Sequence, residues 1–400
     1  MATPKLRFKE FDGDWNLSSL ANISSIITGN TPSTSNREYY DGEFLFVSPV
    51  DIQENRYIEK TKTTLTANGF SKCRHIPENS VLFVCIGSTI GKVAQNKVIC
   101  ATNQQINAVI PKKGYSSDFL YLQLERLAPN IKLNAGVQAV PLINKTEFGK
   151  TLLNTPTFIE QTKIASFLSA MDEKVSQLTQ KHELLSQYKQ GMMQKLFSQQ
   201  LRFKADDGSE FGEWEDKTIE QIANFRRGSF PQPYGLPEWL DSNGFPFVQV
   251  YDVSDKMLLK ERTKIKISQL AADQSVFAKQ GTLIITIQGS IGRIAKMQYD
   301  AYVDRTLLIF QSYNCEVDVD YFKYALFLLF NIEKERAEGA IIKTITKETL
   351  SKFIVQLPCL EEQTKIANFL STIDQKIEVV AQQIEQAKMW KKGLLQQMFV

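Results

Sequence analysis

The sequence offers few side chains for nucleophilic, acid–base or metal chemistry. Its 400 residues include two histidines, His75 and His182, and five scattered cysteines without a Cys-x-x-Cys pair. Serine–histidine–aspartate catalysis and histidine-based metal sites therefore lack their residues, and neither a zinc site nor a disulfide framework is expected. Some nucleases carry Glu-x-Lys after a cluster of carboxylates. That pattern occurs at 215–217 only by chance, in a polar stretch typical of a loop. We therefore expect no catalysis by this chain, and unpaired cysteines favour the reducing cytoplasm.

Two glycine turns, GSTIGKVA at 87–94 and GSIGRIA at 289–295, partly match a phosphate-binding loop. That loop needs four residues between its glycines and a Ser or Thr after its lysine. The first turn has three residues between its glycines and a valine after its lysine, and the second turn is shorter. No Gly-x-Gly-x-x-Gly follows a predicted strand either. The motif favours a turn between two strands, with a basic residue, Lys92 or Arg293, at the same place in both halves.

The remaining candidates are polar and basic side chains in predicted loops. Arginine reads guanine through two hydrogen bonds, asparagine and glutamine read adenine, and lysine and arginine hold phosphates. The residues predicted to contact DNA are Thr31, Ser33, Arg37, Ser88, Lys92, Asn103 and Gln104 in the first half and Arg226, Arg227, Ser229, Gln288, Ser290, Arg293 and Arg305 in the second. The alternative for each is a solvated surface position. Recurrence of the basic turn favours Lys92 and Arg293 over the others.

The elements that would position these side chains occur twice. Residues 156–198 and 358–400 align without a gap and share EQTKIA, a following FLS, an aspartate and a glycine. The preceding regions repeat more faintly, as in LRFKEFDGDW at 6–15 and LRFKADDGSEFGEW at 201–214. If the duplication served stability alone, the helices and the domains would be expected to differ between the two halves to the same extent. The closely matching helices and divergent domains indicate instead a constant frame that carries two different domains.

Each repeated segment predicts one long helix of about 40 residues, or about 60 Å at 1.5 Å per residue. Apolar residues recur in alternating steps of four and three, as in a heptad seam, from Ile164 through Met192 to Leu196 in the first segment. One seam step in each helix is occupied by a lysine, Lys189 or Lys391. Two matching stripes predict that the helices pair with each other, antiparallel. The alternative is that each helix packs only on its own domain.

Gly191 and Gly393 occupy matching positions inside these helical patterns. Glycine in a helix interior costs about 1 kcal/mol relative to alanine. The repeated glycine indicates either a kink or close approach of another backbone, or else the end of each long helix.

The expected fold class is mixed α/β, with two duplicated α/β domains joined by two long helices that form a pseudo-twofold antiparallel coiled coil. The predicted segments are domain 1 at 1–155, helix 1 at 156–200, domain 2 at 201–357 and helix 2 at 358–400. A hydrophobic fraction of 43% suits a globular chain, and no apolar run approaches the length of a membrane span. The net charge of +3 excludes binding to nucleic acid by bulk charge alone.

In this organisation the chain resembles the specificity (S) subunits of type I restriction–modification systems. The resemblance rests on EQTKIASFLSAMDEK and EEQTKIANFLSTIDQK after two divergent domains, on the LRF…W segments and on the GS-x-G turns, and it spans essentially the whole chain. It implies two target recognition domains, each reading one half of a bipartite, asymmetric sequence in double-stranded DNA. The implied location is the cytoplasm, without a membrane.

The resemblance also implies partners that carry the chemistry. Two modification subunits would hold S-adenosylmethionine and methylate adenine, and two restriction subunits would use ATP and Mg²⁺, so this chain would need no cofactor. The helix residues implied in subunit docking are Gln161, Lys163, Ile164, Phe167 and Leu168 and their counterparts Gln363, Lys365, Ile366, Phe369 and Leu370. Two other classes remain open: a fused methyltransferase, whose cofactor motif is not found, and a scaffold whose duplicated domains bind proteins or sugars.

Overall fold

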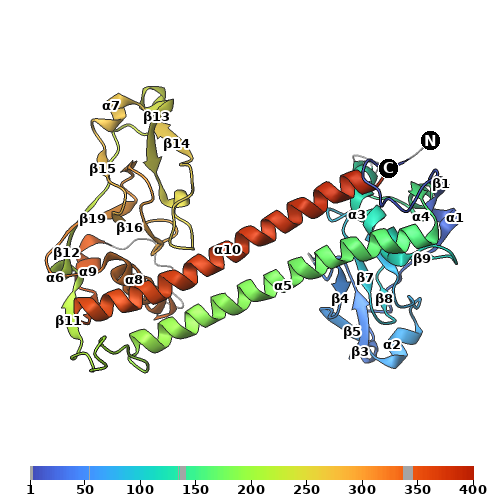
Figure 1. Cartoon of the computed structure of the whole chain (residues 1–400), viewed down its shortest axis with the longest axis horizontal. Helices are drawn as coiled ribbons and strands as arrows, with labels where there is room; N and C mark the ends of the chain where they lie inside the picture. Colours follow the sequence, from blue (N-terminus) through green and yellow to red (C-terminus); the bar gives the residue numbers. More distant parts are fainter. Residues whose placement is uncertain (1–2, 54, 134, 136–140, 337–345) are drawn as a thin grey trace. The chain divides into compact units, whose positions relative to one another are not determined.

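The computed structural model describes residues 3–53, 55–133, 135, 141–336 and 346–400. The chain divides into two compact units, Met1–Glu183 with Glu378–Val400 (unit 1) and Leu184–Ile377 (unit 2). Both boundaries fall inside the long helices. Each unit therefore contains one of the two α/β domains and part of each long helix, and Figure 1 labels many of their elements.

The described residues of unit 1 form three sheets, with both parallel and antiparallel pairing. β1 (Asn16–Ser19) pairs antiparallel with β10 (Leu152–Thr155). The five-stranded sheet has the order β2 (Ser24–Thr28), β9 (Ile106–Pro111), β6 (Val81–Val84), β7 (Val93–Asn96) and β4 (Tyr57–Ile58). The three-stranded sheet has the order β5 (Thr63–Leu65), β3 (Tyr40–Val47) and β8 (Ala101–Thr102). The helices are α1 (Leu20–Ile23), η1 (Arg37–Tyr39), α2 (Ala67–Ser71), α3 (Ser117–Leu133) and α4 (Lys145–Gly149).

Unit 2 has a similar arrangement, with four strands in each of its two larger sheets. β11 (Glu215–Thr218) pairs with β20 (Ile354–Leu357). One four-stranded sheet has the order β12 (Ala223–Arg227), β19 (Leu307–Tyr313), β16 (Leu283–Thr286) and β17 (Ile294–Lys296). The other has the order β14 (Ile265–Ile267), β13 (Leu240–Val248), β18 (Ala301–Val303) and β15 (Val276–Ala278). The helices are α6 (Ile219–Ile222), η2 (Pro237–Trp239), η3 (Val250–Asp252), α7 (Gln269–Ala272), α8 (Val319–Arg336) and α9 (Lys347–Ser351).

A longer helix packs on the five-stranded sheet of unit 1 and on the β12–β19–β16–β17 sheet of unit 2. In unit 1, Phe119 and Leu120 of α3 lie fully buried in the same cluster as Val81, Phe83 and Val109 from the central strands. In unit 2, Tyr321 and Phe322 of α8 take the corresponding place. Burial of each helix face against these short strands adds apolar contact that stabilises the domain.

The two long helices, α5 (Phe158–Phe197) and α10 (Leu360–Met398), confirm the predicted pairing. In unit 1 the first part of α5 and the last part of α10 share one core, since Ile164 and Leu168 cluster with Leu394 and Leu395. In unit 2 the last part of α5 and the first part of α10 share a core, since Leu196 clusters with Ile366. The helices therefore run antiparallel (Figure 1). The alternative, that each helix packs only on its own domain, is therefore wrong. One seam position also differs, because Met193 is buried where the heptad pattern predicts Met192.

Gly191 and Gly393 both lie inside continuous helix, several residues before the ends of α5 and α10. The prediction that the helices end at these glycines is wrong. A Cβ built on either one meets no atom of the described chain within 4 Å. No backbone in the described part of the chain therefore explains the choice of glycine.

Candidate nucleic-acid interface

Four loops of domain 1 meet at one end of its sheets: those after β2, β3 and β6, and the turn before β9. The Cys85 amide at the end of β6 donates to the Gln105 carbonyl of that turn at 2.8 Å. The loop after β2 contacts the turn before β9, because the Gly29 amide donates to the Ile106 carbonyl at 3.1 Å. The same turn contacts the end of β3, where the Asn103 amide donates to the Val47 carbonyl at 3.0 Å. A Cβ on Gly29 would lie 2.2 Å from the Thr102 carbonyl oxygen, so only glycine allows this approach.

Several predicted DNA contacts of domain 1 lie in this loop cluster. Thr31 and Gln104 are exposed and share a hydrogen bond of 2.8 Å between Oγ1 and Oε1. Ser88 is exposed in the glycine turn after β6. Asn103 is half-buried and bonds to the Gln105 amide and side chain, so it shapes the turn. The cluster thus presents hydroxyl and amide groups to solvent.

Ser33 and Arg37 lie farther along the loop after β2. Ser33 is exposed, and its hydroxyl lies 2.8 Å from that of Ser35. Arg37 is exposed at the start of η1.

Domain 2 forms the equivalent cluster with different side chains. The Gly228 amide donates to the Leu307 carbonyl at 3.0 Å, and the Asp304 amide to the Val248 carbonyl at 3.0 Å. The Tyr234 hydroxyl donates to the Asp304 carboxylate, and the guanidinium of Arg305 lies 4.9 Å from the Tyr234 ring centroid. Arg305 replaces Gln104 on an equivalent turn. The same frame therefore presents arginine and tyrosine here, where domain 1 presents glutamine and threonine.

The sequence analysis missed Tyr234, which is exposed in a proline- and glycine-rich loop. An aromatic residue between turn-forming residues was the available signal.

The basic residues of the two glycine turns share an intramolecular contact. Lys92 Nζ donates to the Ile52 carbonyl at 2.7 Å, and Arg293 Nη1 donates to the Val253 carbonyl at 3.3 Å. Arg293 also pairs with Asp255 at 2.7 Å. Ile52 and Val253 occupy matching positions after β3 and β13. This contact explains why a basic residue recurs, while its contact with DNA stays a prediction.

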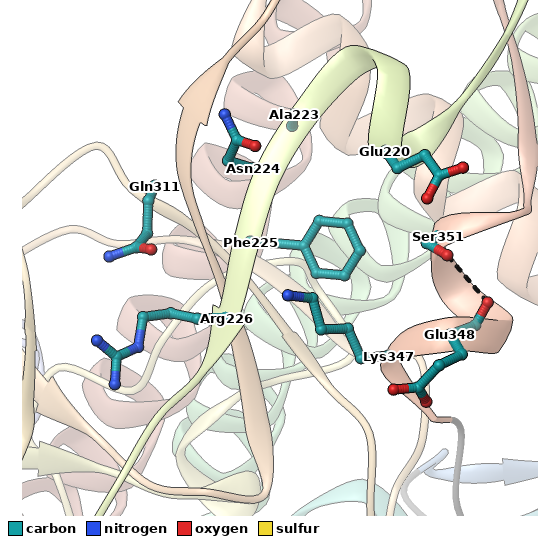
Figure 2. A pocket seen from close by; sticks show the side chains of 9 residues that line it. All are labelled: Glu220, Ala223, Asn224, Phe225, Arg226, Gln311, Lys347, Glu348 and Ser351. Carbon is teal, nitrogen blue, oxygen red and sulfur yellow. Dashed lines mark hydrogen bonds between the residues drawn. The ribbon is translucent and has the colours of Figure 1, made fainter.

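Arg226 contributes to a polar groove along the edge strand β12 (Figure 2). The lining residues are Glu220, Ala223, Asn224, Phe225, Arg226, Gln311, Lys347, Glu348 and Ser351. Arg226 and Gln311 lie on one side, Glu220 and Glu348 on the other, and Lys347 Nζ stands 5.4 Å from the Phe225 ring centroid. Because the groove presents carboxylates beside its cations, it does not form a uniform phosphate-binding surface.

The other predicted residues of domain 2 lie around the loop cluster. Arg227 is exposed at the end of β12. The Ser229 hydroxyl donates to the Gln274 carbonyl at 3.1 Å, Gln288 is half-buried and Ser290 is exposed.

The Glu-Gln of the repeated helix motif bonds inside its own unit. Glu160 is buried and accepts two hydrogen bonds of 2.8 Å from Arg7. The Glu160 hydrogen bond raises the Arg7 pKa, and burial opposes that shift. Gln161 is also buried, accepts from the Ser116 amide and donates to the Pro156 carbonyl, each at 2.9 Å. Glu362 and Gln363 repeat these contacts with Arg202, Asp318 and Pro358. The motif therefore fixes each helix to its own domain.

The remaining residues predicted for subunit docking divide by exposure. Ile164, Leu168, Ile366 and Leu370 are buried in the cores of their units. Lys163 pairs with Glu10, and Lys365 with Asp206 at 2.7 Å. Phe167 is exposed with its ring edge against Phe8, and half-buried Phe369 packs similarly on Phe203. Docking through the exposed members stays a prediction.

The lysines that interrupt the seam form matching ion pairs between α5 and α10. In unit 2, Lys189 Nζ lies 2.6 Å from Asp374, whose other oxygen accepts from the Tyr324 hydroxyl at 2.7 Å. In unit 1, Lys391 lies 2.7 Å from Asp172 and 2.8 Å from Glu125. Burial lowers the Lys189 pKa, and Asp374 opposes that shift. Two features of the sequence indicated these pairs: a lysine at an otherwise apolar seam position in each helix, and an aspartate that both helices share.

Within the described ranges, no group of three or more His, Cys, Asp or Glu side chains could hold a metal ion. No helix among the same residues combines the length and apolarity needed to cross a membrane.

Comparison with known proteins gives the class. The family model of the type I restriction modification DNA specificity domain matches residues 12–187 and again 212–389. The chain therefore belongs to this family, and it carries two copies of the specificity domain.

Relatives and solved structures agree with this assignment. The type I restriction enzyme MjaVIII specificity subunit of Methanocaldococcus jannaschii is 22% identical over 97% of this chain and 94% of its own length. The HindI specificity subunit of Haemophilus influenzae is 33% identical, but the match covers 38% of this chain and 35% of that protein. The S subunit of the type I system from M. genitalium has the same fold, with a TM-score of 0.64 at 17% identity over 100% and 99% of the two chains.

Proposed function

We propose that this specificity subunit reads a bipartite, asymmetric sequence in double-stranded DNA, with one half-site for each recognition domain. The observation that carries the proposal is the pair of equivalent loop clusters with different exposed groups. Thr31 and Gln104 occupy the first cluster, and Tyr234 and Arg305 the second. Since base-edge contacts depend on side-chain type, two such clusters on one frame suit two different half-sites.

The long helices fix the spacing of the half-sites and bind two modification subunits in this proposal. S-adenosylmethionine would be held by those subunits, and ATP and Mg²⁺ by two restriction subunits, in the cytoplasm. This chain would contribute recognition and no catalytic group. Purified without partners, it should show no methyl transfer and no DNA cleavage.

Exchange of residues 1–155 for another domain of the family tests the recognition proposal. Methylated adenines would be mapped in DNA exposed to the reconstituted modification complex. The exchange should change one half of the target and leave the other half and the spacer unchanged. A change in both halves would contradict one half-site per domain.

Point variants give a sharper version of the same test. Arg305→Ala should weaken binding of the complex to its target by about 1–3 kcal/mol, as expected for loss of a base contact. It should also relax the preference at one position of the second half-site. Gln104→Ala should relax the first half-site instead. Exposed Lys266→Ala, on strand β14, is a matched loss of charge and should leave both half-sites unchanged. If the complex shows no preference among DNA sequences, the alternative of a protein-binding scaffold is favoured.

A further inference from the structure

One exposed side chain stands at the tip of an equivalent turn in each domain. The residue before the tip accepts, through its side-chain oxygen, a hydrogen bond from the amide of the residue after the tip, at 3.1 Å in domain 1 and 2.9 Å in domain 2. The tip residue is Gln104 in domain 1 and Arg305 in domain 2, and both are exposed. The turns are therefore built alike around two different side chains.

Backbone hydrogen bonds also hold the two turns at the same place in their domains. The carbonyl after the tip accepts from the Cys85 amide at 2.8 Å in domain 1 and from the Ile287 amide at 2.9 Å in domain 2. None of these bonds uses the side chain at the tip. The residue type there can therefore change without a change in the turn, as it does between Gln104 and Arg305.

The loop after the first strand of each larger sheet, β2 or β12, contacts the tip side chain. In domain 1 the Thr31 hydroxyl donates to Gln104 Oε1 at 2.8 Å. In domain 2 the guanidinium of Arg305 lies over the Tyr234 ring, 4.9 Å from its centroid. This guanidinium forms no hydrogen bond or ion pair with the residues that the structure describes, so its donors remain available to a ligand.

Tyr234 is itself held from two sides. Its hydroxyl donates to the buried carboxylate of Asp304, which also accepts from the Thr306 amide at 2.9 Å and the Thr306 hydroxyl at 2.5 Å. Its ring centroid lies 4.8 Å from that of buried Phe230. The carboxylate of Asp304 is therefore occupied by uncharged donors, and the fixed tyrosine ring sets the position of Arg305.

The two tip residues suit base edges better than phosphates. An ionic phosphate contact would need a cation at both tips, and Gln104 has no charge. A guanidinium held over a ring presents the planar pair of donors that guanine O6 and N7 accept. Glutamine offers one donor and one acceptor, which match N7 and N6 of adenine.

We propose that the tip residue reads one base in each half-site: Arg305 reads a guanine in the second half-site, and Gln104 reads an adenine in the first. Tyr234 is the positioning residue for Arg305. This inference rests on the proposed function and names the bases that two of its residues select.

Exchange of the tip residues tests the assignment. Methylation by the reconstituted modification complex would be sequenced on DNA libraries in which each half-site position is randomised in turn. Arg305→Gln should lose the preference for a G·C pair at one position of the second half-site and weaken binding to the wild-type target roughly 5- to 150-fold. Gln104→Arg should lose the preference for an A·T pair at one position of the first half-site. Arg262→Gln, at an exposed arginine before β14, is the matched control and should leave every base preference unchanged.

Variants of Tyr234 separate positioning from stability. Tyr234→Phe and Tyr234→Ala both lose the hydroxyl bond to Asp304, so both should lower the melting temperature of the free chain. Only alanine also removes the ring beside the guanidinium. Tyr234→Ala should therefore reduce discrimination at the guanine position roughly 2- to 30-fold, whereas Tyr234→Phe should keep it at the wild-type level. The salt dependence of binding, measured by fluorescence anisotropy, should be the same in both variants, because no phosphate contact is lost.

Three results would overturn the proposal. In the first, the position that responds to Arg305→Gln is an A·T pair in the wild-type target, or the position that responds to Gln104→Arg is a G·C pair. In the second, Arg305→Gln lowers the salt slope by about one and changes no base preference, as expected for a phosphate contact. In the third, Tyr234→Phe and Tyr234→Ala reduce discrimination equally. Each of these results leaves the half-sites defined by domain exchange intact, whereas a wild-type complex without base preference would contradict the proposed function itself.

Discussion

Replacing Lys189 with methionine should destabilise unit 2 by about 2 kcal/mol. Its side chain is 14% exposed and that of Asp374 is 35% exposed. Breaking a fully buried ion pair costs about 3–5 kcal/mol, and a fully exposed pair contributes about 0–1 kcal/mol. The intermediate exposure gives the intermediate value. At about 2–4 °C per kcal/mol for a unit of this size, the melting temperature should fall by about 4–8 °C.

The double variant Lys189→Met with Asp374→Asn should recover much of that loss. Asparagine leaves no unpaired charge and still offers an oxygen to the Tyr324 hydroxyl, which bonds to Asp374 at 2.7 Å. Lys391→Met is the matched test in unit 1. Asp172 stays 3.7 Å from Arg56 in that variant, but Glu125 loses its lysine, so a similar loss of about 2 kcal/mol is expected. Differential scanning calorimetry and urea unfolding would compare the variants, and additive effects of the two substitutions would refute a coupled pair.

The pH dependence gives an independent check on the same pair. Burial already lowers the Lys189 pKa below 10.5, and Asp374 opposes this shift. In Asp374→Asn the lowering should be larger. Between the folded and unfolded pKa values the unfolded chain binds more protons, so stability rises with pH there. The loss in free energy of unfolding of Asp374→Asn relative to wild type should therefore become smaller as pH rises toward 10.5. A deficit that is constant with pH would refute the reasoning.

Three further predictions concern the loops, the core and the spacer. Alanine at Lys92 or Arg293 should weaken the complex on all DNA sequences and lower its salt slope by about one, measured by fluorescence anisotropy; an unchanged slope would leave these residues only their loop contacts. Burial raises the pKa of Cys85 and Cys100 to about 12, so stability should be full below pH 9 and fall between pH 9 and 12 by about 1.4 kcal/mol per pH unit for each thiol, with a shallower fall in Cys85→Ala. Deleting residues 177–180 with their counterparts 379–382 shortens both helices by about 6 Å and should shorten the methylated target's spacer by one or two base pairs, whereas an unchanged spacer would contradict the ruler role.

The sequence was sufficient for the fold because its signals were periodic and repeated. Strands such as β6 and β16 are continuous apolar runs, and the heptad seam predicted the pairing of α5 with α10. The two-stranded ribbon of β1 with β10 was not predicted, because its strands are short and come from opposite ends of the domain sequence. Contacts of that sequence separation leave no local pattern.

Site residues were harder to predict, because a loop side chain can serve the fold and the ligand equally well. Lys92 and Arg293 were selected for their recurrence, and the structure gives that recurrence a carbonyl partner within each domain. Conversely, Tyr234 has no counterpart in a repeated motif, and its position beside Arg305 could not be inferred from spacing. Repetition thus identifies what the frame needs, while residues that distinguish the domains are more informative about recognition.

The same reasoning separates two kinds of repeated residue in the helices. Glu160 and Gln161 have internal partners in unit 1, and their counterparts have the same partners in unit 2, so folding of each unit accounts for their repetition. Gly191 and Gly393 are repeated just as faithfully, but no described neighbour accounts for them. Their repetition therefore has no explanation in the contacts of either unit. The halves of this chain therefore serve as each other's control: repeated residues with the same internal partners define the frame, and residues that differ between equivalent positions are the candidates for recognition.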